Sequence, residues 1–219
     1  QMPSAKASTA QTIAPNPKWT PPHGLKQQPL WPNGAPDMEA TALPAETVFD
    51  VKKVKDRYYT GIANVSIPTM TVFPAKGKNT GVSMLVFPGG GFQILAIDLE
   101  GSEICDWLTS KGITCIVLKY RVPKSNHYWD KDCKCSITPP VPFALQDAQR
   151  SIRLVRSKAG ELKIDPNKIG VIGFSAGGYL VAQTSNLFEP AYRPVDAADK
   201  LSSRPDFAIA LYPGHLCRA

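Results

Sequence analysis

Gly173-Phe174-Ser175-Ala176-Gly177-Gly178 is the stretch of this sequence that decides the fold. The apolar, β-branched run Lys168–Ile172 before it predicts a buried strand, and residues 179–183 after it are good helix formers. A serine between a strand and a helix, with glycine two residues before and two after, is typical of a nucleophile elbow, because the turn is too sharp for larger neighbours. The pentapeptide also occurs by chance in about one chain of this size in ten, so the flanking strand and helix carry the prediction.

A second motif, Pro88-Gly89-Gly90-Gly91-Phe92, directly follows the apolar run Gly81–Phe87, which predicts a strand buried on both faces. Three consecutive glycines let backbone N–H groups approach a ligand without side chains in the way. Acyl cleavage develops negative charge on the carbonyl oxygen, and N–H donors held there lower the barrier by several kcal/mol. A tight turn and a phosphate-binding loop are alternatives, but the loop has neither a Gly-Lys-Ser/Thr ending nor G-x-G-x-x-G spacing. With the elbow about 85 residues downstream, it predicts an oxyanion loop.

The two motifs together predict an unusual conformation for the serine. Ser175 should have φ above zero or an otherwise strained backbone, and its Oγ should be open to a pocket. An ordinary helical Ser175 that faces away from Gly89–Gly91 would rule out a serine hydrolase.

Composition and charge narrow the class of protein. With 219 residues, 43% of them hydrophobic and 20% charged, the chain fits one globular domain with a sizeable core. The net charge is +7, but the basic residues are scattered among acidic ones, which argues against nucleic acid as a partner. Its apolar runs are far shorter than the ~20 residues of a membrane span, so no membrane insertion is expected. The chain begins at Gln1 without a signal-peptide core, so we expect a mature form or an engineered piece.

Residues 1–46 are predicted to form a Pro-rich arm, because they hold nine of the 21 prolines and show almost no hydrophobic periodicity. Within the arm, residues 30–36 have bulky side chains between turn formers, so we expect this part to dock on the body. Trp19 and Trp31 are expected to be packing anchors rather than ligand-stacking groups. Residues 47–219 form the domain that carries the two motifs.

Strands and helices alternate along this domain. The expected strands are Thr47–Lys55, Thr60–Phe73 (two strands broken at Pro68), Gly81–Phe87, Ile113–Tyr120, Lys168–Ile172 and Phe207–Tyr212. Besides the helix after the elbow, the expected helices are Leu99–Lys111 and Phe143–Ala159. This order predicts an α/β fold whose mostly parallel sheet has helices on both faces and an antiparallel edge formed by the first strands.

Hydrophobic periodicity assigns a core face to each of these two helices. In the first helix the core face is predicted to contain Ile104, Trp107 and Leu108. In the second helix the apolar stripe is Leu145, Ala148, Ile152 and Val155, and the residues outside it include Arg150, Arg153 and Arg156. The later segment 189–204 is expected to be a solvated polar loop.

The five cysteines give no clear site. Cys105 and Cys115 lie in apolar contexts and are expected to be plain core residues. Cys133 and Cys135 flank one lysine in a polar loop near His127, which is too few ligands for a metal prediction. We therefore expect neither a metal nor a cofactor.

From the first strands through Tyr212 the sequence resembles α/β-hydrolases of the esterase/lipase superfamily. The glycine loop and the elbow are similar to those of bacterial acetyl-xylan-esterase-like enzymes and other small-acyl carboxylesterases. Residues 30–36 resemble the N-terminal loop of that usually exported group, which implies a secreted or periplasmic location. The resemblance implies Ser175 as nucleophile, with oxyanion donors from the backbone N–H groups of Gly90, Gly91 and Ala176. The histidine that opens the lipase-type HGGG loop is Pro88 here, which removes a side chain that helps to fix the loop.

The larger departure from this family lies after the elbow. The family orders its triad as Ser, then Asp or Glu, then His, but only 44 residues follow Ser175. The acid and the base are therefore expected beyond Ala219, with the C-terminal strands of the fold missing. His215 is the one downstream candidate for the base. The carboxylates that could orient it are Asp196, Asp199 and Asp206, although a solvated loop is the simpler interpretation of all three.

Three hypotheses for the function remain. The leading one is a serine carboxylesterase for short acyl esters, such as acetyl groups on polysaccharide, with a small-molecule or carbohydrate ester as substrate. An inactive or non-enzymatic binding protein, or a fragment, is the alternative. An amidase or peptidase is the third, because amides and esters require the same nucleophile and oxyanion donors.

Two further expectations concern the surface. Loops at the carboxyl ends of the strands rim the site in such folds, so Lys124–Pro142 is expected to help form the acyl or alcohol pocket, unless it is a plain surface insertion. If no further strands follow, Phe207–Tyr212 is an open apolar sheet edge, which predicts a homodimer or a companion polypeptide across it. A chain without the general base should also be a poor catalyst.

Overall fold

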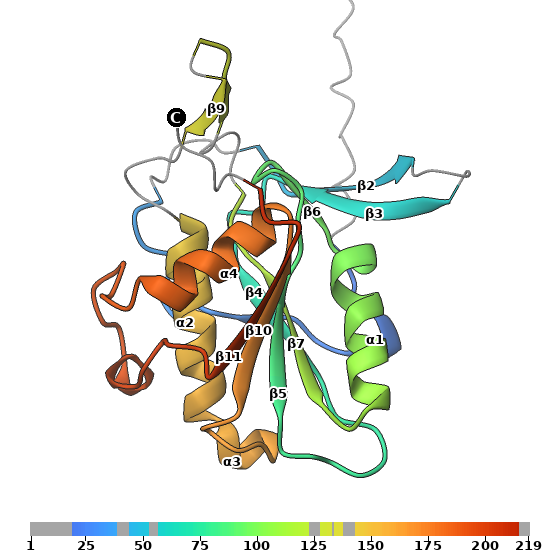
Figure 1. Cartoon of the computed structure of the whole chain (residues 1–219), viewed down its shortest axis with the longest axis vertical. Coiled ribbons are helices and arrows are strands. Elements are labelled where there is room, and N and C mark those ends of the chain that lie inside the picture. Colours follow the sequence, from blue (N-terminus) through green and yellow to red (C-terminus); the bar gives the residue numbers. More distant parts are fainter. Residues whose placement is uncertain are drawn as a thin grey trace, which may run out of the picture.

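The computed structural model describes residues 19–38, 44–52, 57–122, 128–132, 134–137 and 143–214. In this part of the chain a mostly parallel sheet of six strands forms the centre of the molecule (Figure 1). In spatial order its strands are β1 (Gln28–Pro29), β4 (Thr69–Phe73), β7 (Thr114–Lys119), β5 (Ser83–Phe87), β10 (Ile169–Phe174) and β11 (Phe207–Leu211). The last four of these run parallel, whereas β1 and β4 pair antiparallel at the other edge.

The central strands are the apolar runs that the sequence indicated. Every residue of β5, β7 and β10 is buried, because helices cover both faces of this part of the sheet. The register pairs Gly173 of β10 with Phe87 of β5, so the carboxyl ends of the two strands lie side by side. The elbow after β10 and the glycine loop after β5 therefore begin at neighbouring points of one sheet end.

Helices cover the two faces of the sheet, as Figure 1 shows, with α1 on one face and α2 and α4 on the other. The helices are α1 (Glu103–Ser110), α2 (Phe143–Ser157), α3 (Ala159–Leu162) and α4 (Ala176–Asn186). Short turns are η1 (Pro22–Gly24), the π-helical η3 (Asp98–Ser102), which leads into α1, and η4 (Ala197–Lys200). The predicted α/β class with helices on both faces is confirmed.

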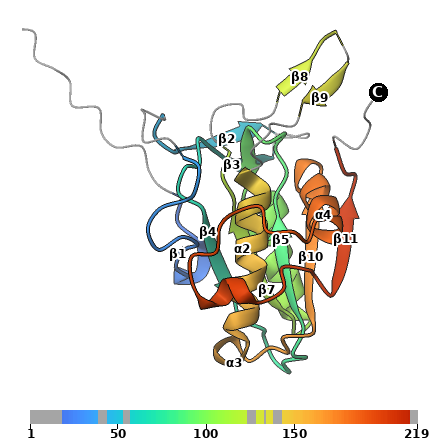
Figure 2. The same cartoon turned by 90° about the vertical axis from the view of Figure 1, so that its left-hand side faces the viewer.

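A second, smaller sheet contains β2 (Thr47–Lys52), β3 (Tyr58–Ala63) and β6 (Ile94–Ala96), all antiparallel. The break at Pro68 was predicted correctly, but only the strand after it joins the main sheet. The three-residue β6, which follows the glycine loop, was not predicted because it is too short for an alternating pattern. A two-stranded hairpin, β8 (Tyr128–Asp130) and β9 (Cys135–Ile137), projects from the end of the molecule at which β5 and β10 finish (Figures 1 and 2).

The described part of the arm packs on the body through its two tryptophans. Trp19 and Trp31 are buried, as predicted, and β1 adds an antiparallel strand to β4. The Trp31 indole donates a hydrogen bond of 2.8 Å to the carboxylate of Asp147. That carboxylate also pairs at 3.0 Å with Arg121, and both of these side chains are fully buried. Trp31, Arg121, Gln146 and Asp147 are called the arm cluster below.

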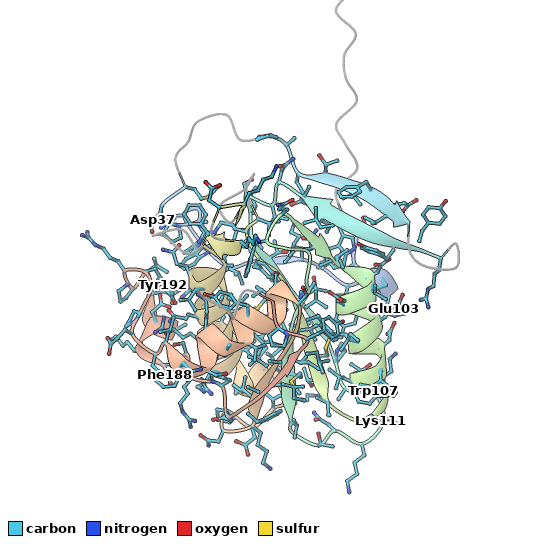
Figure 3. The ribbon with its side chains drawn as sticks, turned by 45° about the horizontal axis from the view of Figure 1, so that its top comes forward. Asp37, Glu103, Trp107, Lys111, Phe188 and Tyr192 are labelled. Carbon is cyan, nitrogen blue, oxygen red and sulfur yellow. A yellow bond between two sulfur atoms is a disulfide. The ribbon has the colours of Figure 1, made fainter. Side chains whose placement is uncertain are left out.

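Two predictions about helix faces are wrong. Trp107 is 60% exposed and lies with Glu103 and Lys111 on the outer side of α1 (Figure 3). Leu108 is buried and Ile104 packs against the core, as predicted, but Cys105 and Thr109 are buried where Trp107 was expected. The core face is therefore displaced by about one residue from the predicted stripe.

The second error concerns the arginines of α2. Arg150 and Arg153 are buried, because residues 189–204 fold back over the helix. Arg150 pairs with Asp196 at 2.5 Å and with Asp199 at 3.0 Å, and Arg153 donates to the Leu201 carbonyl. The loop that was expected to be solvated is therefore bound to α2 by ion pairs.

The expectation that Cys105 and Cys115 are plain core residues is also wrong. The two cysteines form a disulfide that joins α1 to β7, and both are fully buried. The prediction failed because an apolar context fits a buried thiol and a buried disulfide equally well.

Strand β11 lies at the outer edge of the sheet beside α4 (Figure 2). Among the described residues, no strand pairs with its outer side. Phe207 is 37% exposed and Ile209 is 43% exposed, so the predicted apolar edge is present in this part of the chain.

Candidate active site

Ser175 connects β10 to α4 at a sharp turn. Its backbone has φ 51° and ψ −113°, a conformation that costs free energy for a residue with a side chain. The residue is half-buried, whereas its immediate neighbours in the strand and helix are buried. The prediction of a positive φ or an otherwise strained backbone is therefore confirmed, and it is the positive φ that the structure has. The open pocket predicted for its Oγ stays a prediction.

Glycines next to Ser175 are required by the close approach of α4 to the strands. A Cβ added to Gly177 would lie 1.9 Å from the Phe87 carbonyl oxygen, and one added to Gly173 would lie 2.1 Å from the Gly177 carbonyl oxygen. Both distances are far below van der Waals contact, so no larger residue fits without moving the helix. This is the steric reason for the elbow motif.

The glycine loop lies close to Ser175 at one residue and to the chain after the loop at the next. A Cβ added to Gly89 would lie 3.2 Å from the Ser175 Cβ, and one added to Gly90 would lie 2.1 Å from the Ile94 carbonyl oxygen. Gly90 and Gly91 have φ of 139° and 64°, which are left-handed values that favour glycine. The carbonyl of Gly90 accepts hydrogen bonds from Gln93 and Ile94, which closes the loop.

The backbone N–H groups of Gly90 and Gly91 are donors without an acceptor among the described residues. The N–H group of Ala176 opens the first turn of α4, where helix N–H groups have no partner within the helix. The N-terminus of a helix also carries a partial positive charge, which favours a negative oxygen nearby. The three predicted donors thus lie on the two segments that meet at Ser175, and an oxyanion hole at this point stays a prediction.

The chain after β11 closes over the backbone of the elbow. The Ser175 N–H donates to the Leu211 carbonyl, and the Gly214 N–H donates to the Ser175 carbonyl, both at 3.0 Å. A Cβ added to Gly214 would lie 3.7 Å from the Ser175 Oγ. Residues 211–214 therefore form one side of the candidate site.

Two groups that sequence reasoning missed hold the glycine loop. The Glu100 carboxylate accepts a hydrogen bond of 2.9 Å from the Gly89 N–H and another of 2.9 Å from the Tyr212 hydroxyl. The Tyr120 hydroxyl donates to the Pro88 carbonyl. Glu100 fell within a predicted helix with no motif around it. The only available signal was that Pro88 leaves the loop without the anchoring histidine of lipases.

The two tyrosines are protonated donors at neutral pH. Burial and a hydrogen bond to Glu100 raise the pKa of Tyr212 to about 12. Complete burial, with a smaller effect of the Glu100 charge, raises the pKa of Tyr120 well above its ordinary value. Both hydroxyls therefore keep the proton that they donate to the loop or to its carboxylate partner.

Several predicted site residues do not come together at Ser175. Asp196 and Asp199 are bound to Arg150, and Asp206 accepts from the Ile169 N–H at the opposite end of β10 from the elbow. These contacts leave none of the three carboxylates to orient a base. His215, His127 and most of the insert Lys124–Pro142 lie outside the described residues, so their predicted roles stay predictions.

Metal ligation is not supported within the described part of the chain, where no three His, Cys, Asp or Glu side chains cluster. Cys133 and His127 lie outside that part. None of the helices in the described ranges combines the length and apolarity that a membrane crossing requires.

The fold and the elbow define an α/β-hydrolase, and solved structures agree. An acetyl ester-xyloside bifunctional hydrolase from Caldicellulosiruptor lactoaceticus superposes with a TM-score of 0.62 and 31% identity, over 86% of this chain and 57% of that one. Esterase 2 of Thermogutta terrifontis has a TM-score of 0.51 at 24% identity, over 78% of this chain and 58% of that one, which shows the fold alone.

Residues 73–191 match the BD-FAE family model, so the chain belongs to the BD-FAE family. It is 33% identical over 134 residues to an acetylxylan esterase of Xylanibacter ruminicola, a match that covers 61% of this chain and 23% of the relative. It is 30% identical over 151 residues to an arylesterase of Saccharolobus solfataricus, which covers 69% of this chain and 44% of the relative. The chain thus spans less than two thirds of the length of these relatives.

Proposed function

We propose that this chain contributes the nucleophile and the oxyanion donors of a serine carboxylesterase that cleaves short acyl esters. The observation that carries the proposal is the strained Ser175, held with φ 51° beside a glycine loop in which the Gly90 and Gly91 N–H groups have no acceptor among the described residues. Acetyl groups on polysaccharide are the proposed substrates, because the acetylxylan esterase and the acetyl ester-xyloside hydrolase are both similar to this chain.

In the proposed reaction the Ser175 Oγ attacks the ester carbonyl carbon while its proton passes to a histidine. The carbonyl oxygen becomes negative and is stabilised by the N–H groups of Gly90, Gly91 and Ala176. The ester C–O bond then breaks, and the alcohol leaves with the proton from the imidazolium. Water attacks the acyl-serine in the same way and releases the carboxylic acid.

The histidine has two candidate positions. His215 is the only histidine after Ser175 in this sequence, and it directly follows Gly214, which lies beside the Ser175 Oγ. A histidine beyond Ala219, or on a companion polypeptide, is the other candidate, because the relatives are longer than their matches to this chain. Turnover by the chain and by His215→Ala separates the two: a large loss of kcat assigns the base to His215, and an unchanged low rate assigns it elsewhere.

The decisive experiment measures acetate release from acetylated xylan and p-nitrophenyl acetate hydrolysis by the chain, by Ser175→Ala and by Ser157→Ala. Ser175→Ala should lose all activity above background, and a fluorophosphonate probe should label only proteins that keep Ser175. Ser157 is exposed on α2, so Ser157→Ala is a matched control that should behave as wild type. Probe labelling without turnover would indicate an activated Ser175 whose acyl-enzyme is not hydrolysed. Absence of both labelling and turnover would indicate a missing base or favour the binding-protein hypothesis. Faster cleavage of an acetanilide than of the ester would favour an amidase.

The open edge of β11 and the disulfide support two smaller proposals. An exposed apolar strand edge is a pairing site, so we propose that a second copy or a companion polypeptide covers Phe207–Leu211. A monomer by size-exclusion chromatography with light scattering would contradict this.

A secreted or periplasmic location fits the Cys105–Cys115 disulfide, since disulfides persist in oxidising compartments. Free thiols at both cysteines in protein purified without reductant would argue against it.

A further inference from the structure

The Glu100 carboxylate joins two segments that are far apart in the sequence. One oxygen accepts the Gly89 N–H and the other accepts the Tyr212 hydroxyl, both at 2.9 Å. Glu100 itself lies in η3, where the neighbouring Asp98 carboxylate accepts the N–H groups of Thr60 and Leu99. The bridging carboxylate is thus presented by a turn that is itself fixed by hydrogen bonds.

Both bridged segments contact Ser175 at the candidate active site. Gly89 is the residue of the glycine loop that packs against the Ser175 side chain. Tyr212 directly follows Leu211, whose carbonyl accepts the Ser175 N–H. Glu100 therefore connects the loop that carries two of the proposed donors to the segment that holds the backbone of the proposed nucleophile.

The glycine loop needs such a support for a physical reason. Glycines have no side chains to pack and lose the most conformational freedom on folding, so Gly89–Gly91 depend on hydrogen bonds to hold their shape. A hydrogen bond from a backbone N–H to a charged carboxylate is about twice as strong as a neutral one. On the other side the Tyr120 hydroxyl holds the Pro88 carbonyl, so that the loop is fixed at two successive residues.

Glu100 has no competing role as an ion-pair partner in the part of the chain that the structure describes. Among the described residues no Lys or Arg side chain pairs with it, whereas Glu103, one turn later, pairs with Arg57 at the surface. The Glu100 carboxylate is half-buried, and both of its oxygens accept hydrogen bonds from residues next to Ser175 or its backbone partner.

We propose that Glu100 is a positioning residue for the ester cleavage described above. It sets the distance between the glycine loop and Ser175 by binding Gly89 and Tyr212 with one carboxylate. This inference rests on the proposed function, because the distance matters only if donors and nucleophile act on one carbonyl group. Glu100 takes no part in proton transfer and acts through the loop.

Three substitutions separate this role from a general structural one. In Glu100→Gln the amide oxygen can still accept from Gly89 while the amide N–H₂ donates to the Tyr212 oxygen, so the bridge is kept without the charge. Glu100→Leu removes both contacts at similar volume, and Tyr212→Phe removes one. Glu103→Gln breaks only a surface pair and is the matched control.

The expected result is a split between kcat and KM. Glu100→Leu should lower kcat for p-nitrophenyl acetate by about 10- to 100-fold with little change in KM, because misplacement of reacting groups by about 1 Å costs that much. Tyr212→Phe should have a smaller effect, Glu100→Gln should restore most of the loss, and Glu103→Gln should match wild type. Amide hydrogen exchange of residues 88–93 should be faster in Glu100→Leu than in Glu100→Gln.

Amide hydrogen exchange measures whether Glu100 holds the glycine loop even if the chain has no esterase activity. Unchanged exchange of residues 88–93 in Glu100→Leu would overturn the inference even if the wild-type chain is inactive, and so would wild-type kcat in a folded Glu100→Leu. If Glu100→Leu does not fold, equal kcat for Glu100→Gln, Tyr212→Phe and wild type would overturn it as well. If the fluorophosphonate probe does not label Ser175 in the wild-type chain, that result counts against the proposed function. It does not count against the bridge from Glu100 to Gly89 and Tyr212.

Discussion

The elbow at Ser175 and the arm cluster are both densely packed regions, but they are held together by opposite means. The elbow is built from backbone atoms and glycines, and an added Cβ at Gly177 would lie 1.9 Å from a carbonyl oxygen. The arm cluster is built from side chains, with Arg121 and Asp147 fully buried and 3.0 Å apart. The elbow depends on the absence of side-chain atoms, and the arm cluster depends on the pairing of buried charges.

Because of this difference, substitutions in the two regions should have different effects. A buried ion pair is weak support for stability, but removing one partner leaves an uncompensated charge in a place without water. The elbow contains no buried ion pair. A single added carbon atom would instead clash with the backbone and distort the turn. Substitutions in the cluster should therefore lower stability, and substitutions in the elbow should lower turnover.

The largest expected effect belongs to Asp147→Ala. It leaves the buried Arg121 guanidinium without its carboxylate, and it also removes the acceptor of the Trp31 indole. The free energy of unfolding should fall by about 3–5 kcal/mol in denaturant titrations.

The matched control for this variant is Glu103→Ala, which breaks an ion pair whose two side chains are 63% and 44% exposed. It should change stability by about 1 kcal/mol or less, because exposed pairs are screened by water. Equal losses in the two variants would show that burial does not set the cost in the arm cluster. The fraction of Asp147→Ala that stays folded should keep its turnover, since the cluster contacts neither Ser175 nor Gly89–Gly91.

The second-largest effect is expected for Gly177→Ala, and it should fall mainly on turnover. The new methyl group would meet the Phe87 carbonyl, so α4 must shift away from β5 and move Ser175 with it. Turnover should fall by about 100-fold, with a stability loss of about 1–3 kcal/mol.

Gly160→Ala is the matched control on α3, because an added Cβ there has no heavy atom within 4 Å. It should leave turnover unchanged and stabilise the protein by up to about 1 kcal/mol. A fully active Gly177→Ala would contradict the steric account of the elbow.

The same contrast explains which parts could be predicted from the sequence. Steric demands leave a local signature, so the glycines around Ser175, the loop at Gly89–Gly91 and the buried strands were all recognised. The positive φ of Ser175 was predicted for the same reason. Each of these features depends on residues that are close together in the chain.

Contacts between distant residues leave no such signature. The pairing of Arg150 with Asp196 and Asp199 buried a side chain that periodicity placed on the outside. The bridge from Glu100 to Tyr212 spans 112 positions, and no motif marks either end. The Cys105–Cys115 disulfide spans only 10, yet composition could not distinguish it from two buried thiols.

The smallest expected effect concerns Asp196 and the pH dependence of stability. Hydrogen bonds from Arg150 lower the pKa of Asp196 below its ordinary value, and burial opposes this only in part. A carboxyl group with a lowered pKa in the folded state stabilises the protein above its unfolded pKa of about 4. That contribution is lost as the pH falls through the folded pKa, when the carboxylate takes up a proton.

Asp196→Asn removes this contribution at every pH, so the two proteins should differ near neutral pH and converge in acid. Because the Asp196 side chain is 41% exposed, water screens the pair, and the difference in Tm near pH 7 should be at most about 4 °C. Thermal melts from pH 7 down to pH 2.5 measure it. A difference that stays constant down to pH 2.5 would mean that the asparagine changes packing rather than charge, and that Arg150 is held mainly by the buried Asp199 and the Leu30 carbonyl.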